Sequence, residues 1–429
     1  MRLERVEVGP DPVATAARVR ALAPAPQSVS AAVAEIVETV RAGGDRALRE
    51  LVARFDSGGT PGAGGTDSLR VAPEQLDTAL LDDDVRAGLE VAIANVALVA
   101  DAGVGSDVEV HLPQGHRVVL REVPVRRAAI YVPGGRAPYP SSLVMGVVTA
   151  RAAGVEEVVV LTPPPIAPVI RGACALCGVH EVYAMGGAHG IAALAYGTES
   201  IERVDVIAGP GSLIVQEAKR QVSDSVGIDG FYGPSDVLVL ADATADARLV
   251  ALDLLAQGEH GPGAPVVAVS DSDAFFEALE AQLVELGPQR PASHPAAFVL
   301  ARAGTLRDAL AFAEAFAPEH LELVGPDAER LARRVRCSGC VFVGAAGATA
   351  FGDYVAGSNH SLPTGGSARF ASGLSARHFR RRYSEVHVGT AAPALAAAGA
   401  PIARAEGFDV HAESMEARVA GPVGENPPS

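Results

Sequence analysis

Strand-like and helix-like segments alternate through most of the chain, and this alternation constrains the fold more than any other feature. Short apolar runs bounded by turn residues predict the strands, and apolar residues at helical spacing predict the helices between them. One series runs from residue 128 to about residue 222, and a second runs from residue 237 to residue 343. Such alternation favours parallel sheets covered by helices. We therefore expect an α/β protein with two units of similar architecture.

The segments outside the two series differ in character. The N-terminal third is predicted to be helix-rich, with an amphipathic helix over residues 30–55, and the segment after about residue 381 is predicted to be helical and polar. That tail has the character of an appendage rather than of a core. The predicted strands lie at 128–132, 158–161, 181–184, 204–208, 237–240, 265–269, 297–301, 321–324 and 341–343.

Size and charge exclude several classes of function. With 429 residues the chain is too long for one ordinary core, so two to three domains are expected. The formal net charge of −16 argues against a nucleic-acid partner and against an anionic membrane surface. Because the N-terminus lacks an apolar leader and no apolar run reaches membrane-spanning length, we expect a soluble, cytoplasmic protein. The C-x-x-C pairs Cys174/Cys177 and Cys337/Cys340 lie far apart in sequence, which favours reduced thiols over a compact zinc module.

Two motifs at helix ends could bind ligands. The turn Gly209-Pro210-Gly211 joins a predicted strand to a helix, where an anion could bind, but it lacks the third glycine of a dinucleotide fingerprint. A tight structural turn explains it equally well. Gln257 and His260 are three residues apart, so they could converge on one metal ion or form a solvated helix end.

Three further segments carry acids and imidazoles. Glu319 and His320 follow a proline at a strand entrance, where they could act in acid–base chemistry or form a surface pair. The Gly-rich loop 351–366 has few packing residues, so its polar groups should face a site. The tail motif 406–411 could bring an acid and an imidazole together only in a loop, because its spacing does not fit one helix face.

Taken together and in order, these segments resemble the histidinol dehydrogenase family, from about residue 128 to the C-terminus. The N-terminal third matches only in general pattern. The matching stretches are YVPGGRAPYPSS (131–142), GGAHGIAALAYGT (186–198), AGPGSLIVQEAKR (208–220), VGID (226–229), GPSDVLVLAD (233–242), LLAQGEH (254–260), APEHLEL (317–323), GDYVAGSNHSLPTGG (352–366) and EGFDVH (406–411).

The resemblance implies an architecture. It indicates two similar Rossmann-like parallel-sheet domains with helical N- and C-terminal appendages, in an intertwined homodimer. On this reading, residues 26–127 join 235–380 in the domain with the zinc and catalytic residues, and 128–234 form the NAD side. Residues 1–25 would be an N-terminal helical segment, and 381–429 a tail that reaches the partner subunit.

The resemblance also implies an activity: zinc-dependent, NAD-linked, four-electron oxidation of L-histidinol to L-histidine through L-histidinaldehyde. His320 would take the alcohol proton and Glu319 would activate water. Zinc would be held by Gln257, His260, Asp353 and His411, which would also contact the substrate, as would His320. The other substrate residues would be Ser235, His360 and Glu406, and the NAD⁺ residues would be Tyr131, His189 and Ser212.

Three positions depart from the family pattern. This chain has His189 where the family has Gln, Ser212 where it has Asn, and Asp236 where it has Glu. The first two fall where the family contacts NAD, so we expect weaker cofactor binding with the catalytic set intact. Three alternatives stay open: a paralogue oxidising another polar alcohol such as a sulfonated diol, a zinc hydrolase, and a non-catalytic zinc-binding homologue.

Overall fold

The computed structural model describes residues 2–22, 28–56, 69–134, 137–231, 234–261 and 265–419. The chain divides into two compact units. The first unit comprises Met1–Gly103 and Val125–Phe379, and the second comprises Val104–Pro124 and Arg380–Ser429. In the described part of the chain, none of the helices has both the length and the apolar character needed to cross a membrane.

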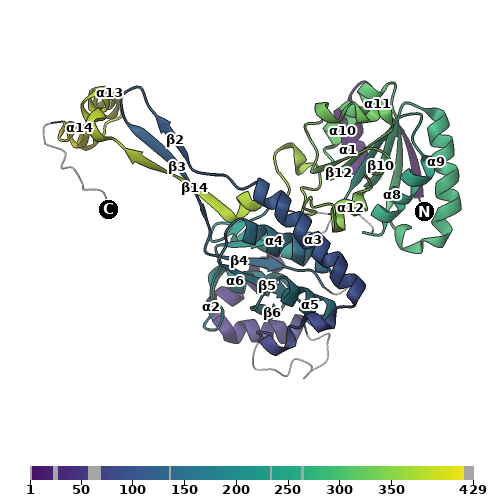
Figure 1. The fold of residues 1–429 in the computed structure, drawn as a ribbon, viewed down its shortest axis with the longest axis horizontal. Helices are drawn as coiled ribbons and strands as arrows, with labels where there is room; N and C mark the ends of the chain where they lie inside the picture. Colours follow the sequence, from purple (N-terminus) through teal and green to yellow (C-terminus); the bar gives the residue numbers. More distant parts are fainter. Residues whose placement is uncertain are drawn as a thin grey trace. The chain divides into compact units, whose positions relative to one another are not determined.

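A six-stranded parallel sheet forms the centre of one part of the first unit. Helices α1 (Pro12–Arg20) and α10 (Leu306–Phe316) share a core with one face, and α8 (Ala247–Gly258) and α9 (Asp273–Leu286) cover the other (Figure 1). Because both faces are covered, the strands at 237–241 and 265–270 are apolar runs rather than alternating ones. In sheet order the strands are β1 (Arg2–Glu7), β11 (Ala297–Arg302), β10 (Pro265–Ser270), β9 (Val237–Ala241), β12 (His320–Val324) and β13 (Cys340–Val343).

A five-stranded parallel sheet forms the centre of the other part. Helices α2 (Ser30–Phe55), α6 (Gly187–Tyr196) and α7 (Leu213–Val222) share a core with one face. Helix α4 (Pro140–Ala152) packs on β4 and is flanked by α3 (Asp83–Ala102) and α5 (Pro168–Leu176). In sheet order the strands are β6 (Val182–Ala184), β5 (Glu157–Thr162), β4 (Arg127–Tyr131), β7 (Val206–Ala208) and β8 (Gly227–Ile228).

Short elements complete the first unit. They are α11 (Pro326–Glu329), α12 (Thr349–Tyr354) and the 3-10 helices η1 (Pro73–Gln75), η2 (Thr78–Leu80), η3 (Gly287–Gln289), η4 (Pro291–Ser293), η5 (Ala332–Arg334), η6 (Ser367–Arg369) and η7 (Ala376–Phe379).

The N-terminal hundred residues divide between the two sheets differently from the expected boundaries. Residues 1–25 are not a purely helical segment, because β1 pairs in parallel with β11 and α1 packs on α10. Helix α2, expected with the 235–380 domain, instead buries its apolar stripe against α6 and α7. An amphipathic pattern shows that a helix buries one face, but it does not say against which sheet.

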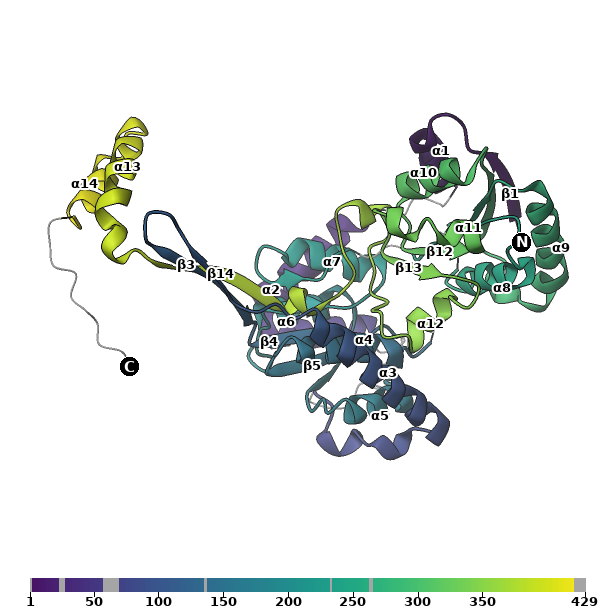
Figure 2. The same cartoon turned by 45° about the horizontal axis from the view of Figure 1, so that its top comes forward.

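The second unit is an antiparallel ribbon joined to a small helical hairpin (Figure 2). Its strands are β2 (Val108–His111), β3 (Arg117–Pro124) and β14 (Arg380–His387), and its helices are α13 (Ala392–Ala405), α14 (Asp409–Glu416) and the 3-10 helix η8 (Gly389–Ala391). Within the tail expected at 381–429, the described residues form a strand first and helices afterwards, and residues 104–124 belong with them. Its core is small: Ala400, Ala403 and Ala412, with Met415 against them.

Candidate functional site

Glu319 and His320 lie at the amino end of the six-stranded sheet, where β9 and β12 begin. The two strands pair in parallel with His320 opposite Val237, so the residues just before them, Asp236 and Glu319, face each other. Asp236, Glu319 and His320 are each at most 5% exposed. The sequence left open whether Glu319 and His320 form a surface pair, and their burial excludes that alternative.

Backbone and side-chain bonds connect this group. The backbone N of Glu319 donates to Oδ1 of Asp236 at 2.8 Å, and the backbone N of Asp236 donates to Oε2 of Glu319 at 3.1 Å. Nδ1 of His320 lies 3.1 Å from the carbonyl oxygen of Asp236. Its Nε2 lies 3.7 Å from Oδ1 of Asp353.

The environment moves the pKa values of both groups. Burial raises the pKa of Glu319 to about 7, although the neighbouring His320 opposes the shift. Burial lowers the pKa of His320, but the carboxylates of Glu319 and Asp353 more than offset it and leave the pKa at about 9. A carboxyl group whose pKa lies near neutral pH, beside an imidazole whose pKa is raised, can exchange protons with a substrate.

The expected metal ligands of the first unit gather around the same strand ends. Gln257 closes α8, and its Nε2 donates to Oγ of Ser235 at 2.7 Å. His260 follows α8 in an exposed turn, and Asp353 is among the charges that act on its imidazole. Asp353 lies in α12, where imidazoles at 260, 320 and 360 all act on it. Gln257, His260 and Asp353 thus lie near one another.

A second layer of carboxyl groups lies behind these ligands. Glu322, two residues beyond His320 on β12, accepts from the backbone N of Thr349 at 2.8 Å and from its Oγ1 at 2.5 Å. Thr349 begins α12, the helix that carries Asp353. Asp253 on α8 lies close enough to Glu322 for the two carboxyls to interact, and burial raises the pKa of both. Glu322 and its neighbours thus connect the three elements that carry Gln257, His320 and Asp353.

His360 lies beside Asp353 and α4. Its Nδ1 is 2.8 Å from the carbonyl oxygen of Asp353, and its Nε2 is 3.1 Å from Oγ of Ser142. The adjacent Asn359 donates from Nδ2 to the carbonyl oxygen of Met145 and to Oγ1 of Thr149. The loop with the imidazole is therefore fastened to α4.

The expected cofactor residues lie near the carboxyl ends of the strands in the five-stranded sheet. Tyr131 ends β4, and β4 and β7 are the adjacent strands from which the chain proceeds in opposite directions. Ligands of open α/β sheets bind at such a position. Ser212 is exposed and begins α7 without making a side-chain cap, so its hydroxyl does not occupy the amides of that first turn.

The turn 209–211 is held from beneath. Lys219, the single lysine of the chain, is fully buried and donates from Nζ to the carbonyl oxygen of Gly209 at 3.0 Å, while it also pairs with Asp229. Oδ2 of Asp229 in turn accepts from the backbone N of Gly209 at 2.6 Å. A Cβ on Gly209, whose φ is +119°, would lie 2.2 Å from the carbonyl oxygen of Tyr131. Only glycine fits where this turn crosses β4.

His189 has a different setting from the one expected of a cofactor contact. It is 2% exposed, and its Nε2 lies 2.9 Å from Oδ2 of Asp56. The same carboxylate oxygen accepts from the backbone N of Gly186 at 3.0 Å. The imidazole of His189 is thus hydrogen-bonded within the protein, at the start of α6.

Two expected residues, Glu406 and His411, belong to the second unit. Glu406 caps α13, and His411 lies in α14 with its ring 5.2 Å from that of Phe408. Both are exposed. Among the side chains that the structure describes, no group of three or more His, Cys, Asp and Glu is arranged to hold a metal ion. Three of the four expected zinc ligands lie in the first unit, and one of these three, Gln257, has an amide side chain.

The cysteines and several supporting residues also bear on the predictions made from the sequence. All four cysteines are free; Cys174 and Cys177 are buried, whereas Cys337 and Cys340 are half-buried. Reasoning from the sequence missed Arg20 and Ser142 and treated Asp236 only as a departure from a pattern. Ser142 stood inside a quoted motif, whereas nothing local to Arg20 signals its contact with residues nearly 300 positions away.

Comparisons with known proteins agree with one another. The sequence model of the family "Histidinol dehydrogenase" matches residues 22–419. Histidinol dehydrogenase from Rhodospirillum rubrum is 40% identical over 410 residues, covering 92% of this chain and 93% of the relative. That from Haloarcula marismortui is 41% identical over 402 residues, covering 90% and 92%. A crystal structure of histidinol dehydrogenase from Elizabethkingia anophelis superposes with a TM-score of 0.89 at 27% identity and covers 98% of each chain.

Proposed function

The chain belongs to the histidinol dehydrogenase family, and we propose that it oxidises L-histidinol to L-histidine through L-histidinaldehyde, with zinc and two molecules of NAD⁺. The observation that supports this most directly is the buried pair Glu319 and His320, fixed against Asp236 and next to Asp353. A zinc hydrolase could use Glu319, but it would have no need of the ordered turn and open helix end at Ser212 on the other sheet.

The proton transfers follow from the geometry of His320 and Glu319. Nδ1 of His320 faces a carbonyl oxygen, which only accepts, so neutral His320 carries its proton on Nδ1 and is basic at Nε2. Nε2 can then take the alcohol proton while the carbon loses a hydride. The carboxylate of Glu319 can take a proton from the water that adds to the aldehyde. Loss of a second hydride from the hydrated aldehyde gives the acid, a four-electron oxidation in all.

Zinc would be held by Gln257, His260 and Asp353, with His411 as the fourth ligand. An amide oxygen, two imidazoles and a carboxylate suit this borderline-soft cation. When bound, zinc supplies an anchor for the amine and imidazole of the substrate, which orients the alcohol carbon. Ser235 supports this arrangement because its Oγ accepts from the Gln257 amide N, leaving the amide oxygen of Gln257 free to face a cation.

NAD⁺ would bind near Tyr131 and Ser212, and it supplies the hydride acceptor. The uncapped start of α7 suits a phosphate group, since its amide groups and helix dipole favour negative charge. His189 would act on this site from behind, through Asp56 and the first residues of α6.

The second unit would serve a partner subunit of a homodimer. Its hairpin has a core of three alanines, and Ile402, Phe408 and Val410 are each more than half exposed. Apolar surface of this kind on so small a unit suits an interface. Glu406 and His411 would reach the partner's substrate pocket from this hairpin.

The reaction is tested by following NADH absorbance with zinc, NAD⁺ and L-histidinol. Two NADH should form per histidinol consumed, chelation should abolish turnover, and zinc should restore it. His260→Ala should lose bound metal and activity together, whereas His294→Ala removes an imidazole, just after η4, that is not among the expected ligands and serves as a control. NADH formation with another polar alcohol but not with histidinol would indicate a paralogue. Full activity after removal of the metal would exclude the zinc role.

A further inference from the structure

Asp236 contacts the Glu319–His320 dipeptide through both its side chain and its backbone, although it has no role in the proposed reaction so far. Its side chain accepts from the backbone N of Glu319, its backbone N donates to the Glu319 carboxylate, and its carbonyl oxygen faces both N and Nδ1 of His320, at 3.3 and 3.1 Å. Asp236 is 1% exposed. It is therefore placed to orient both groups from within the protein.

The Asp236 carboxylate is itself held by Arg20 at the end of α1. Nη1 of Arg20 donates to Oδ2 of Asp236 at 3.2 Å, while Oδ1 is engaged by Glu319. A buried carboxylate needs such a partner, because an unpaired charge away from water is costly. One oxygen of the Asp236 carboxylate thus accepts from Arg20, and the other accepts from Glu319.

Arg20 also holds the turn that leads into Glu319. Its Nε donates to the carbonyl oxygen of Phe316 at 3.1 Å, its Nη2 donates to that of Ala317 at 3.2 Å, and its guanidinium lies 3.8 Å from the Phe316 ring centroid. These carbonyls end α10, where a cation is favoured. Ala317 has φ +48°, which a residue with a Cβ adopts only when its surroundings hold it there.

We propose that Asp236, held by Arg20, is a positioning residue that keeps the Glu319 carboxylate in place for the water step of the reaction. This inference rests on the proposed function and deepens it. The side chain of Asp236 accepts from the backbone N of Glu319 and so fixes the residue that carries the carboxylate, whereas it makes no bond to His320. The Glu319 carboxylate and the His320 imidazole both bond to the Asp236 backbone. The aldehyde-to-acid half-reaction should therefore depend on the Asp236 side chain more than the alcohol-to-aldehyde half-reaction does.

The test compares both half-reactions in matched variants. Asp236→Asn keeps the shape, removes the charge and places an amide against Arg20. It should slow oxidation of supplied histidinaldehyde about ten- to a hundredfold, the size expected when a reacting group is misplaced, with the KM for histidinol unchanged. Arg20→Met should act in the same direction, and the double variant should lose little more, because the two residues act as a unit.

Two controls separate this role from a general loss of structure. Arg18→Met removes an exposed arginine from the same helix and should leave both half-reactions unchanged. The Arg18 guanidinium donates to the carbonyl oxygen of Glu7 at 3.5 Å. Asp236→Glu restores the charge and the residue of the family pattern, and it should recover most of the aldehyde half-reaction. Thermal unfolding of each variant reports its fold, and Arg20, 22% exposed at its side chain, tolerates substitution better than Asp236.

The outcomes distinguish the inference from the function on which it rests. Equal losses in the two half-reactions of Asp236→Asn and Arg20→Met would overturn the inference while leaving the proposed function intact. So would an effect of Arg18→Met as large as that of Arg20→Met. A wild-type enzyme that oxidised neither histidinol nor histidinaldehyde would remove both together.

Discussion

The imidazole of His189 and the carboxylate of Asp56 form a buried hydrogen bond of 2.9 Å between the start of α6 and the end of α2. The ring also stacks on Phe55, with centroids 6.0 Å apart and planes inclined by 20°. Because Asp56 also accepts from the backbone N of Gly186, one carboxylate oxygen fixes the turn and the imidazole together. This histidine stands where the family pattern has glutamine, so the departure has a structural partner.

His189→Gln should lower stability more than it alters cofactor binding. Glutamine can keep one hydrogen bond to Asp56 but loses the stacking on Phe55, so the free energy of unfolding should fall by about 0.5–1.5 kcal/mol. Urea denaturation at neutral pH measures this change. A stability equal to wild type, together with a lower KM for NAD⁺, would instead show that the imidazole acts directly on the cofactor.

Ser212→Asn is the matched change at the other departure. Ser212 is exposed and makes no cap, so asparagine can be added there without disturbing packing. Its longer amide side chain should reach the cofactor directly and lower the KM for NAD⁺ roughly three- to tenfold, the value of one hydrogen bond. Initial rates at saturating histidinol give the comparison, and an unchanged or raised KM would show that this position has been re-tuned.

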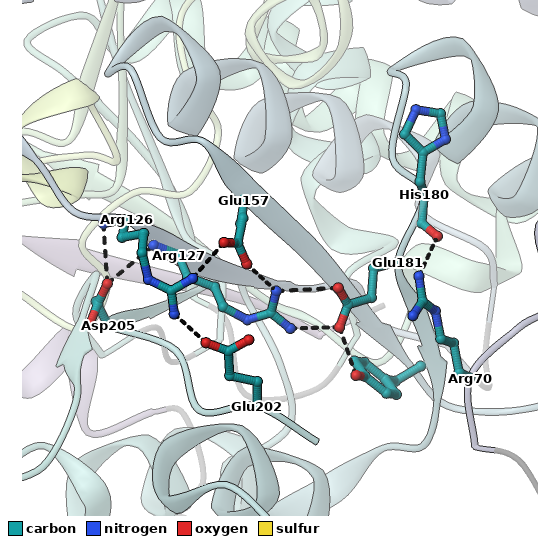
Figure 3. A network of polar contacts seen from close by, with 9 residues as sticks. Arg70, Arg126, Arg127, Glu157, His180, Glu181, Glu202 and Asp205 are labelled. Carbon is teal, nitrogen blue, oxygen red and sulfur yellow. Dashed lines mark hydrogen bonds and ion pairs between the residues drawn. The ribbon is translucent and has the colours of Figure 1, made fainter. Parts of the chain in front are cut away.

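A network of ion pairs lies at the amino ends of the strands in the five-stranded sheet, at the edge opposite the expected cofactor residues (Figure 3). Arg127 is 3% exposed, and its guanidinium donates to Glu157 at 2.7 Å and to Glu181 at 2.5 Å. Glu181 also accepts from the hydroxyl of Tyr183 at 2.6 Å. Arg126, half exposed, joins Glu157 to Glu202.

Arg127→Met should destabilise the protein by about 1–3 kcal/mol, because it removes the charged hydrogen bonds of a buried guanidinium to Glu157 and Glu181, whose side chains are 39% and 21% exposed. Burial raises the pKa of Glu181, but its bonds from Arg127 and Tyr183 outweigh burial and leave the pKa lowered. A carboxyl with a lowered pKa contributes stability above its unfolded value of ~4.3 and loses it as the pH falls through the folded value. The difference between wild type and variant should therefore be largest near pH 7 and shrink below about pH 4.

The control for this prediction is Arg126→Met. It removes an arginine that shares Glu157 but is half exposed, so its effect should be much smaller. Denaturant unfolding over the pH range supplies both curves. Equal losses from Arg126→Met and Arg127→Met, or a difference that grew toward acid pH, would contradict the assignment of the stabilising contact to the buried guanidinium.

The sequence carried enough information for the two sheets but not for their edges. Runs such as 237–241 and 265–270 are apolar throughout, as strands covered on both faces must be, and they were predicted correctly. Strand β1, RLERVE, has only two apolar residues, Leu3 and Val6, and pairs with a strand nearly 300 residues away, so no local signal indicated its place. The pairing of β3 with β14 also joins segments far apart in the sequence, which explains why a strand was missed in the tail.

The candidate site was predictable to the extent that its residues stand in motifs. Glu319, His320, Gln257 and Asp353 were named from the sequence, and the structure brings them to the amino ends of β9 and β12. The supporting contacts were not predictable, because a parallel pairing sets Asp236 against Glu319 across 83 positions. Whether Glu406 and His411 join the site stays a prediction.

The aldehyde half-reaction should depend on pH through Glu319. Burial, with the charge of Asp236 adding to it, raises the pKa of this carboxyl to about 7. A carboxyl that accepts a proton from water must be ionised, so the rate should rise with pH, about tenfold per unit below pH 7, and level off above it. Oxidation of supplied histidinaldehyde from pH 5.5 to 8.5 measures the profile. Glu319→Gln should be slow and flat, and a wild-type inflection near the ordinary ~4.3 would exclude this role.

The proposed sharing of His411 between subunits gives the sharpest test of the second unit. If His411 serves the partner's site, a dimer of one His411→Ala chain and one His260→Ala chain has one site lacking both ligands and one site intact. If His411 serves its own chain, every site in the mixture lacks one ligand. Refolding the two inactive variants together at equal amounts should therefore restore about a quarter of the wild-type activity per site, because half of the random dimers are mixed and each has one intact site. Mixing without refolding provides the control, and native mass spectrometry verifies exchange. A verified mixed dimer without activity would place His411 in the site of its own chain.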